Sequence, residues 1–173
     1  MTLRIGQRRL AMAGWADLGP VHLRIAMSFE ELSTADQASN RKAATELAQA
    51  VVQALDWPVA AAWLFGSGAQ GRLRTSSDLD IALLLERPVP ALELAAKAVE
   101  LETLAERRVQ FVQLGEATTI LAHQVLTYGI LLVDRQPRRR HEYVMRAMTD
   151  YLDLKLLRRS GEAALCRRLA HGR

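Results

Sequence analysis

Hydrophobic residues of this chain follow helical spacing in some stretches and strand-like spacing in others. Apolar side chains recur every three or four residues from Ala44 to Leu55, which predicts an amphipathic helix ending near Asp56. Two short apolar runs follow, at residues 59–65 and 81–85, and both have the length and composition of buried strands. The first half of the chain therefore predicts a helix followed by two strands.

The second half of the chain predicts three helices and two strands in alternation. The first helix has Leu94, Ala98, Leu101 and Ala105 on one face and ends at Arg107 and Arg108. The elements predicted after it are a strand at 109–114, a helix at 117–128, a strand at 130–133 and a long helix from Pro137. The order is α-β-β-α-β-α-β-α, which predicts a small α/β domain of the α+β type. The first two strands should pair antiparallel, because the link between them has no room for a crossover helix.

The length of 173 residues fits a single domain with an appended segment. Residues 1–26 show no persistent period, so they are interpreted as an N-terminal arm or as a misassigned start, with Met27 as the alternative first residue. The domain is predicted to span residues 27–173. Its first helix is expected to begin at Ser28, because Glu31 follows three residues later as in a capping box.

The charge of the chain is unevenly distributed. From Arg135 onward there are eleven Lys and Arg against four Asp and Glu, whereas residues 1–134 are mildly acidic. The basic residues alternate with apolar ones at helical spacing and no aromatic platform accompanies them, so no direct nucleic-acid binding is expected. Arg138, Arg139 and Arg140 lie near a predicted helix start, where the dipole disfavours cations, so they are expected either to contact an acidic partner or to be solvated.

Two features bear on the location of the protein. Its apolar runs are much shorter than the roughly 20 residues that cross a bilayer, so no membrane span is predicted. It has a single cysteine, which agrees with a reducing compartment. We therefore expect a cytoplasmic protein.

Two aspartates mark the start of the second predicted strand. Asp78 and Asp80 are two residues apart, so both carboxylates point to the same face at the strand end. Their mutual repulsion is relieved by a hard divalent cation, and Mg²⁺ commonly binds one or two protein carboxylates together with substrate phosphates. An isolated Asp-x-Asp is more often a solvated turn, so further residues must decide.

Glycines and a serine follow the first predicted strand. Gly66 permits a tight turn and close backbone approach, and Ser67 adds a hydroxyl to backbone N–H groups that can surround an anion. Gly68 and Gly71 extend this freedom. A phosphate-binding turn beside a metal-binding pair of carboxylates is the minimum that a protein needs to bind a nucleoside triphosphate with its cation. The sequence contains neither a Walker-type GxxxxGK[ST] motif nor a GxGxxG motif, so the expected phosphate-binding motif is of a different type.

The arrangement of Gly66-Ser67, ten residues and Asp78-Leu79-Asp80 resembles the nucleotidyltransferase superfamily related to DNA polymerase beta. Within it, the chain looks most like the minimal nucleotidyltransferases (MNT), the antitoxins of MNT/HEPN toxin–antitoxin pairs, over about residues 40–160. The resemblance implies the palm fold of that superfamily, a small mixed sheet flanked by helices. It also implies that Asp78 and Asp80 bind one or two Mg²⁺ ions and are catalytic, and that ATP is bound by Gly66, Ser67, Gln70, Gly71 and Ser77.

The same resemblance implies a function. Antitoxins of this family transfer AMP from ATP to a hydroxyl, typically of a tyrosine, on a HEPN ribonuclease toxin. The expected chemistry is attack of the hydroxyl on the α-phosphorus with pyrophosphate leaving. The predicted partners are thus ATP and a HEPN toxin, and assembly with copies of itself or with that toxin is left open.

Two residues depart from the family pattern. Gln70 stands where many members have arginine, and Gln110 stands where the family usually has a third aspartate. An amide offers an oxygen to a metal but is no base at pH 7. Two alternatives therefore stay open: an antitoxin that neutralises its partner by binding, and a nucleotidyltransferase that acts on a small molecule.

Overall fold

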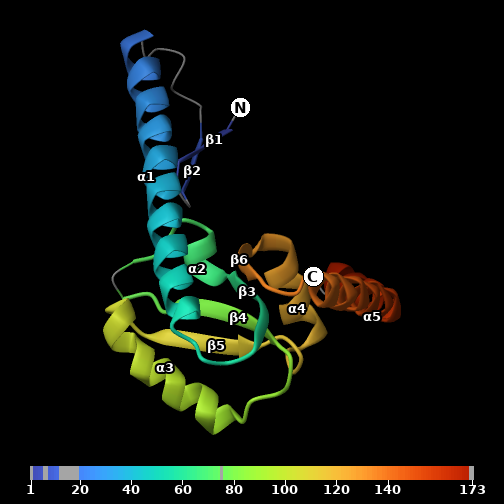
Figure 1. The fold of residues 1–173 in the computed structure, drawn as a ribbon. Helices are drawn as coiled ribbons and strands as arrows, with labels where there is room; N and C mark the ends of the chain where they lie inside the picture. The colour runs from blue at the N-terminus through green and yellow to red at the C-terminus, as the bar shows by residue number, and fades with distance from the viewer. Residues whose placement is uncertain (1, 6–7, 12–19, 75, 172–173) are drawn as a thin grey trace.

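The computed structural model describes residues 2–5, 8–11, 20–74 and 76–171, with side chains for 35–74 and 76–159. Its centre is a four-stranded sheet with the order β5-β4-β3-β6 (Figure 1). The strands are β3 (Val59–Leu64), β4 (Leu79–Leu85), β5 (Val109–Gln113) and β6 (Ile130–Asp134). The predicted antiparallel pairing of β3 with β4 is confirmed, β6 is antiparallel to β3, and β5 is parallel to β4. The sheet is therefore mixed, as the resemblance implied.

Helices cover both faces of this sheet. Helices α1 (Pro20–Gln53) and α3 (Ala91–Ala105) pack on one face, where the larger hydrophobic cluster includes Ala48, Val52, Ile81, Leu83 and Leu101. Helices α4 (Thr119–Tyr128) and α5 (Pro137–His171) cover the other face, where Trp63, Leu84, Leu114, Val125 and the half-buried Tyr143 pack together. The alternation of buried positions along β3 and β4 supplies both clusters. None of the described helices is long and apolar enough to cross a membrane.

The predicted start of the first helix is wrong. Helix α1 begins at Pro20 and runs through Ser28 and Glu31 without a break. Proline suits the first helical position, and neither glycine nor proline occurs between it and Pro58, so nothing in the backbone stops the helix at Ser28. Strands β1 (Thr2–Ile5) and β2 (Arg8–Ala11) precede it as a separate antiparallel pair.

The loop between β3 and β4 opens with a short helix, α2 (Gly66–Ala69), and is held against α1. Asn40 of α1 makes two hydrogen bonds with Leu73: its side-chain amide donates to the carbonyl oxygen at 2.9 Å, and its oxygen accepts from the N–H at 3.0 Å. Gly71 also lies against α1, because a Cβ atom there would be 2.3 Å from the carbonyl oxygen of Gln37. These contacts fix the path of the loop from the end of β3 to the start of β4.

Candidate functional site

The fold brings the end of β3 against the start of β4. Leu64 pairs with Ile81, and the N–H of Phe65 donates to the carbonyl oxygen of Asp80 at 3.0 Å. The next residue, Gly66, is thereby placed beside the Asp80 side chain. The two motifs that are ten residues apart in the sequence thus meet at one end of the sheet.

Gly66 occupies a position that admits no side chain. Its φ is +65°, and a Cβ atom would lie 2.3 Å from Oδ2 of Asp80. Helix α2 begins here, with Phe65 at its N-cap and no side-chain hydrogen bond to the cap. The Asp80 carboxylate therefore lies directly against the turn from which Ser67 and the first backbone N–H groups of α2 emerge.

The two aspartates form an electrostatically strained pair. Asp78 precedes β4 and Asp80 is its second residue, and both side chains are only partly exposed. Burial raises the pKa of the Asp80 carboxyl, and the negative charge of Asp78 raises that pKa further. The ionised form of the pair is therefore less favourable than two isolated carboxylates. A bound cation would reduce the repulsion between them.

Gln110 occupies the third position expected from the family pattern. It is opposite Asp80 in the parallel pairing of β4 with β5, so the two side chains project from the same face of the sheet. Its side chain is exposed. Within the described part of the chain, no three His, Cys, Asp or Glu side chains form a metal-binding group. The candidate cation ligands are therefore two carboxylates and one amide, all oxygen donors of the kind that Mg²⁺ prefers.

Glu116 does not take the place of the missing carboxylate. It follows β5 at the end opposite to Gln110, and the side-chain amide of Gln113 donates to its carboxylate at 3.2 Å. Gln113 itself is buried and exchanges two hydrogen bonds with the backbone of Val89. Glu116 thus belongs to the other end of the sheet.

Other loop residues named by the sequence have contacts of their own. The hydroxyl oxygen of Ser77 accepts from the N–H of Arg74 at 3.0 Å, which leaves its O–H free to donate to an anion. Gln70 is exposed and accepts a hydrogen bond from Arg72. The packing of Gly71 against α1 is by itself a sufficient structural reason for a glycine at this position. A nucleotide-binding role for these three residues stays a prediction.

The sequence did not reveal what anchors this loop. Besides Asn40, Arg107, which follows the C-cap of α3, donates from Nη1 to the carbonyl oxygen of Arg74 at 3.2 Å. Both anchors are 33 residues from their partners in the sequence. The sequence around an isolated polar residue carries no signal for such distant contacts.

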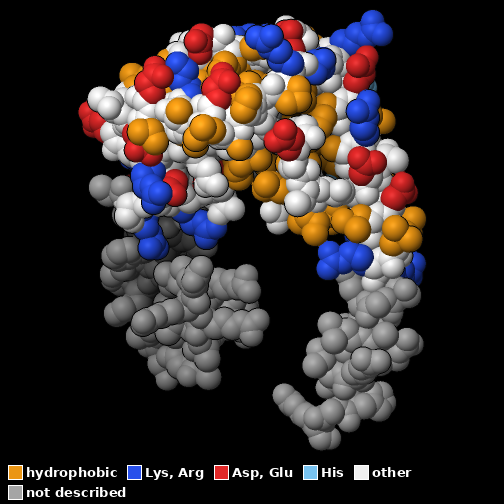
Figure 2. All heavy atoms as spheres, turned by 90° about the horizontal axis from the view of Figure 1, so that it is seen from below, with side chains coloured by type: hydrophobic (Ala, Val, Ile, Leu, Met, Phe, Trp, Pro, Cys, Tyr) orange, Lys and Arg blue, Asp and Glu red, His pale blue; other side chains and the backbone are white. Residues whose placement is uncertain are grey.

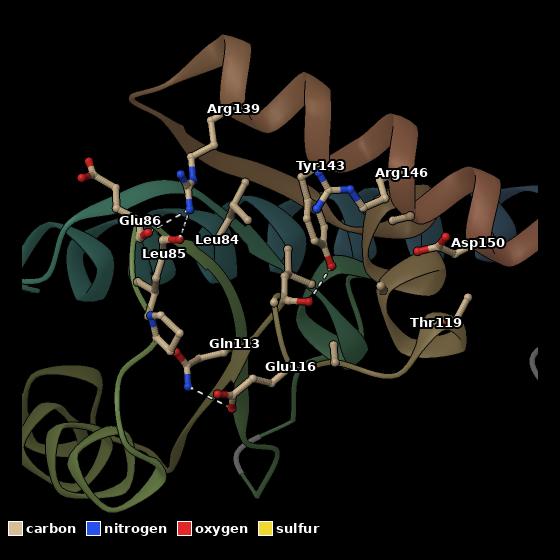
Figure 3. A pocket seen from close by; sticks show the side chains of 16 residues that line it. Leu84, Leu85, Glu86, Gln113, Glu116, Thr119, Arg139, Tyr143, Arg146 and Asp150 are labelled. Atoms are coloured by element: carbon tan, nitrogen blue, oxygen red, sulfur yellow. Dashed lines mark hydrogen bonds between the residues drawn. The ribbon is translucent and has the colours of Figure 1, made fainter.

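The three arginines at the start of α5 each have a contact within the chain. Arg138 pairs with Glu142 and Arg140 pairs with Asp134 at 2.8 Å. Arg139 donates to the carbonyl oxygens of Leu85 and Glu86 (Figure 3). Partners within the chain therefore offset the unfavourable position near the helix N-terminus.

Two hollows lie at different distances from the aspartates. A groove of about 720 Å³ runs along β5 between α3 and the start of α4, and Asp78 and Gln110 are among its lining residues. A pocket of about 350 Å³ lies at the other end of β4, where Tyr143 and Arg146 of α5 face Glu116 (Figure 3). Only the first hollow adjoins the carboxylate pair.

The structure thus places a pair of carboxylates beside a glycine turn at the end of a small mixed sheet, as a candidate cation site. The profile of the family described as "Polymerase beta, Nucleotidyltransferase" matches residues 46–138, which is more than half of the chain. This protein belongs to that family. No curated protein sequence matches it significantly.

Several solved structures that are similar to this chain are toxin–antitoxin complexes. A chain of a toxin–antitoxin complex with AMP-PNP is similar with a TM-score of 0.62 and 24% identity, over 70% of this chain and 98% of that chain. A chain of a mutant MntA-HpeT toxin–antitoxin complex gives 0.59 and 25%, over 67% and 92%. A chain of a complex between a tri-AMPylated Shewanella oneidensis HEPN toxin and an MNT antitoxin gives 0.54 and 22%, over 75% and 98%.

Proposed function

We propose that this protein is the antitoxin of a toxin–antitoxin pair and that it transfers AMP from ATP to a tyrosine hydroxyl of a HEPN ribonuclease toxin. The observation that carries the proposal is the contact geometry of Gly66 and Asp80, which places a glycine turn directly against a carboxyl group whose pKa is raised by burial and by the neighbouring Asp78. The similar fold of chains from complexes with AMP-PNP and with an AMPylated toxin supports the nucleotide and the acceptor.

Each residue has a role in this reaction. Asp78 and Asp80 hold Mg²⁺, with Gln110 as a neutral third ligand. When bound, Mg²⁺ neutralises charge on the phosphates and on the leaving pyrophosphate. Gly66 and Ser67 hold the triphosphate so that its α-phosphorus faces the acceptor hydroxyl. A bond then forms between the hydroxyl oxygen and the α-phosphorus while the bond from that phosphorus to the bridging oxygen breaks.

Proton transfer is where this chain differs from a site with three carboxylates. Gln110 is neutral at pH 7 and takes no proton from the acceptor. The Gln110 side chain is exposed, so the proton has a direct path to water. We expect a rate below that of a site with a base at this position, because general-base catalysis typically contributes about 10²–10⁴-fold.

The test is incubation of the full chain and its HEPN partner with ATP and Mg²⁺, followed by intact mass of both proteins. We expect the partner to gain AMP, and we expect Asp78→Asn and Asp80→Asn to abolish the gain while the fold is retained. Asp153→Asn, an exposed aspartate on α5, is the matched control and should transfer normally. Normal transfer by the double variant of Asp78 and Asp80 would refute the mechanism.

A second candidate, an antitoxin that neutralises its toxin by contact, is favoured by Gln110. The variant Gln110→Asp separates the two. Under the transferase proposal it raises the rate of AMP transfer where proton transfer limits the reaction and otherwise leaves the rate unchanged, because a third carboxylate adds charge and a base. Gln124→Asp, on the exposed part of α4, is the control. A complex that blocks the toxin without AMP on either protein, in the parent and in the variant, would establish the second candidate.

A further inference from the structure

Strand β5 is an edge of the central sheet, and one side of its backbone is unpaired. Leu79 pairs with Val109, and the N–H of Leu79 donates to the carbonyl oxygen of Arg108. In a parallel pair each residue bonds the two neighbours of its partner, so Arg108, Gln110 and Val112 use their backbone groups toward β4. The N–H and C=O groups of Val109 and Phe111 therefore point away from the sheet, and no hydrogen bond among the described residues uses them.

The groove of about 720 Å³ follows this open edge. One wall comes from α3, where Ala95, Ala98, Val99 and Glu102 lie on one face at helical spacing. The other wall comes from Ala117, Thr118 and Leu121 at the start of α4. The floor is β5 itself. A groove with an open strand edge as floor and side chains as walls is the form in which proteins take up an extended peptide as an added strand.

The charges of the groove indicate what kind of peptide fits. Asp78, Glu102 and Glu116 line it, against one arginine, Arg108. An extended segment with basic residues is therefore favoured over an acidic one. Its apolar side chains have a partner in Val99, whose side chain is 66% exposed although it is large and hydrophobic. Figure 2, seen from the side of α3, shows hydrophobic side chains gathered on this side of the molecule, with acidic and basic ones among them.

The groove also leads to the candidate active site. Val109, where the open edge begins, pairs with Leu79, the residue between the two aspartates. A strand added along β5 would lie two strand spacings, about 10 Å, from β4, and one of its residues would reach the Asp78 end of the groove. A hydroxyl on that residue would face the site where the α-phosphorus of ATP is expected.

We propose that β5 binds an extended, basic segment of the acceptor protein as a fifth strand and so delivers its hydroxyl to the Asp78 end of the groove. This inference rests on the proposed function, since it assumes a protein acceptor. A second copy of this chain fits the groove less well. Its own β5 would carry the same walls from α3 and α4, and these would collide before the strands reached the roughly 4.8 Å spacing of a sheet.

Amide hydrogen exchange resolved by residue tests this proposal on the full chain, alone and in complex with the HEPN toxin. The outward amides of Val109 and Phe111 have no hydrogen-bond partner among the described residues of the free chain, so their exchange should slow in the complex by about tenfold or more, most clearly at Phe111, since Val109 is already buried. The amides of Gln110 and Val112, already bonded to β4, should change little. This alternation distinguishes an added strand from general burial of the surface.

A variant pair tests the wall of the groove. Val99→Arg places a positive charge in the groove and should weaken binding of the toxin by about tenfold or more, since it removes an apolar contact and repels a basic segment. Leu104→Arg is the matched control: Leu104 is on the same helix, is 50% exposed and does not line the groove, so binding should stay within about twofold. Equal effects of the two variants on binding would refute the proposal that the toxin binds in this groove.

AMP transfer measured on the same samples separates this proposal from the function. Transfer without protection of Val109 and Phe111 would overturn the docking mode and leave the transferase intact. Protection without transfer would support the docking mode and refute the transferase. Absence of both would refute both proposals. Protection that grows with the concentration of the chain alone would overturn the proposal in favour of self-pairing.

Discussion

Gly66 shows how a single residue couples backbone conformation to the chemistry of the site. Its left-handed φ and its contact with Asp80 are separate constraints, and either alone would disfavour a side chain. Asp80 is partly buried, and burial is the main cause of its raised pKa. The backbone conformation of Gly66 and the electrostatics of Asp80 therefore meet at one contact.

The variant Gly66→Ala should lose stability and transfer together. A left-handed conformation and a close contact cost about 1–3 kcal/mol, so the free energy of unfolding should fall by that amount. The carboxylate must also move, so the affinity for ATP with Mg²⁺ should fall. Urea unfolding and nucleotide titration measure the two effects. Gly115→Ala is the control, because nothing lies within 4 Å of a Cβ atom there. An equal loss in both variants would contradict the argument.

At the scale of elements, the site depends on contacts between segments far apart in the sequence. Helix α1 anchors the loop through Asn40, and α5 is tied to the end of β5 through Tyr143, whose hydroxyl donates to the carbonyl oxygen of Leu114 at 2.6 Å. Each contact joins a helix to a segment that leads into or out of the sheet. Removing either should therefore have effects beyond the residue that is changed.

Asn40→Ala should free the loop from α1. Two partly buried hydrogen bonds are lost and the backbone groups of Leu73 lose their partners, which predicts a loss of about 1–3 kcal/mol in the free energy of unfolding. Thermal unfolding measures it. Thr45→Ala is the control, since its exposed hydroxyl bonds only to a carbonyl within the same helix, and it should cost well under 1 kcal/mol. If the loop is equally protected from proteolysis in both variants, the hydrogen bonds of Asn40 do not hold it against α1.

Tyr143 should make stability sensitive to alkaline pH. Burial raises the pKa of its hydroxyl, and the charge of Asp150 raises that pKa further. A raised pKa in the folded state means that the contribution of Tyr143 is fully present below the unfolded pKa of about 10 and is lost as pH rises through the folded value. Tyr143→Phe should therefore be less stable than the parent by about 1 kcal/mol at pH 8, and the gap should narrow above pH 10.

Urea midpoints at pH 8 and above pH 10 check this prediction. Tyr128→Phe, with a side chain that is 70% exposed, is the control and should track the parent at both pH values. A gap between Tyr143→Phe and the parent that stays constant with pH would contradict it.

At the scale of the whole molecule, β1 pairs with β2 in a sheet of its own, apart from the central sheet. Where the side chains of α1 are described, from residue 35 onward, its buried residues run from Ala44 to Val52. Figure 1 shows α1 extending well past the central sheet toward its N-terminus. The family match likewise begins at residue 46.

A chain that begins at Met27 should therefore keep the fold and the site. We expect its free energy of unfolding to lie within about 1 kcal/mol of the full chain, because every α1 side chain that is described as buried, from Ala44 to Val52, is retained. Thermal unfolding and ATP titration of the two chains measure this. A loss of cooperative unfolding in the shorter chain would show that residues 1–26 belong to the domain, against the prediction of an arm or misassigned start.

The sequence by itself determined the elements and the two motifs of the site. Periodicity is a local property, and it located all four strands of the central sheet and the helices that follow the loop to within a few residues. Local rules also singled out Gly66 and Ser67 at a strand end, and the shared face of Asp78 and Asp80. These local rules did not predict the start of α1 correctly, because a serine followed three residues later by a glutamate also occurs inside helices.

Only the tertiary structure decided how these parts meet. The register of β4 with β5 sets Gln110 beside Asp80 and leaves Glu116 at the other end, and a shift of one residue would have reversed the faces. The partners of Asn40 and Arg139 lie 33 and more than 50 residues away. Such contacts depend on which surfaces pack in three dimensions, and side-chain spacing along the chain carries no record of that packing.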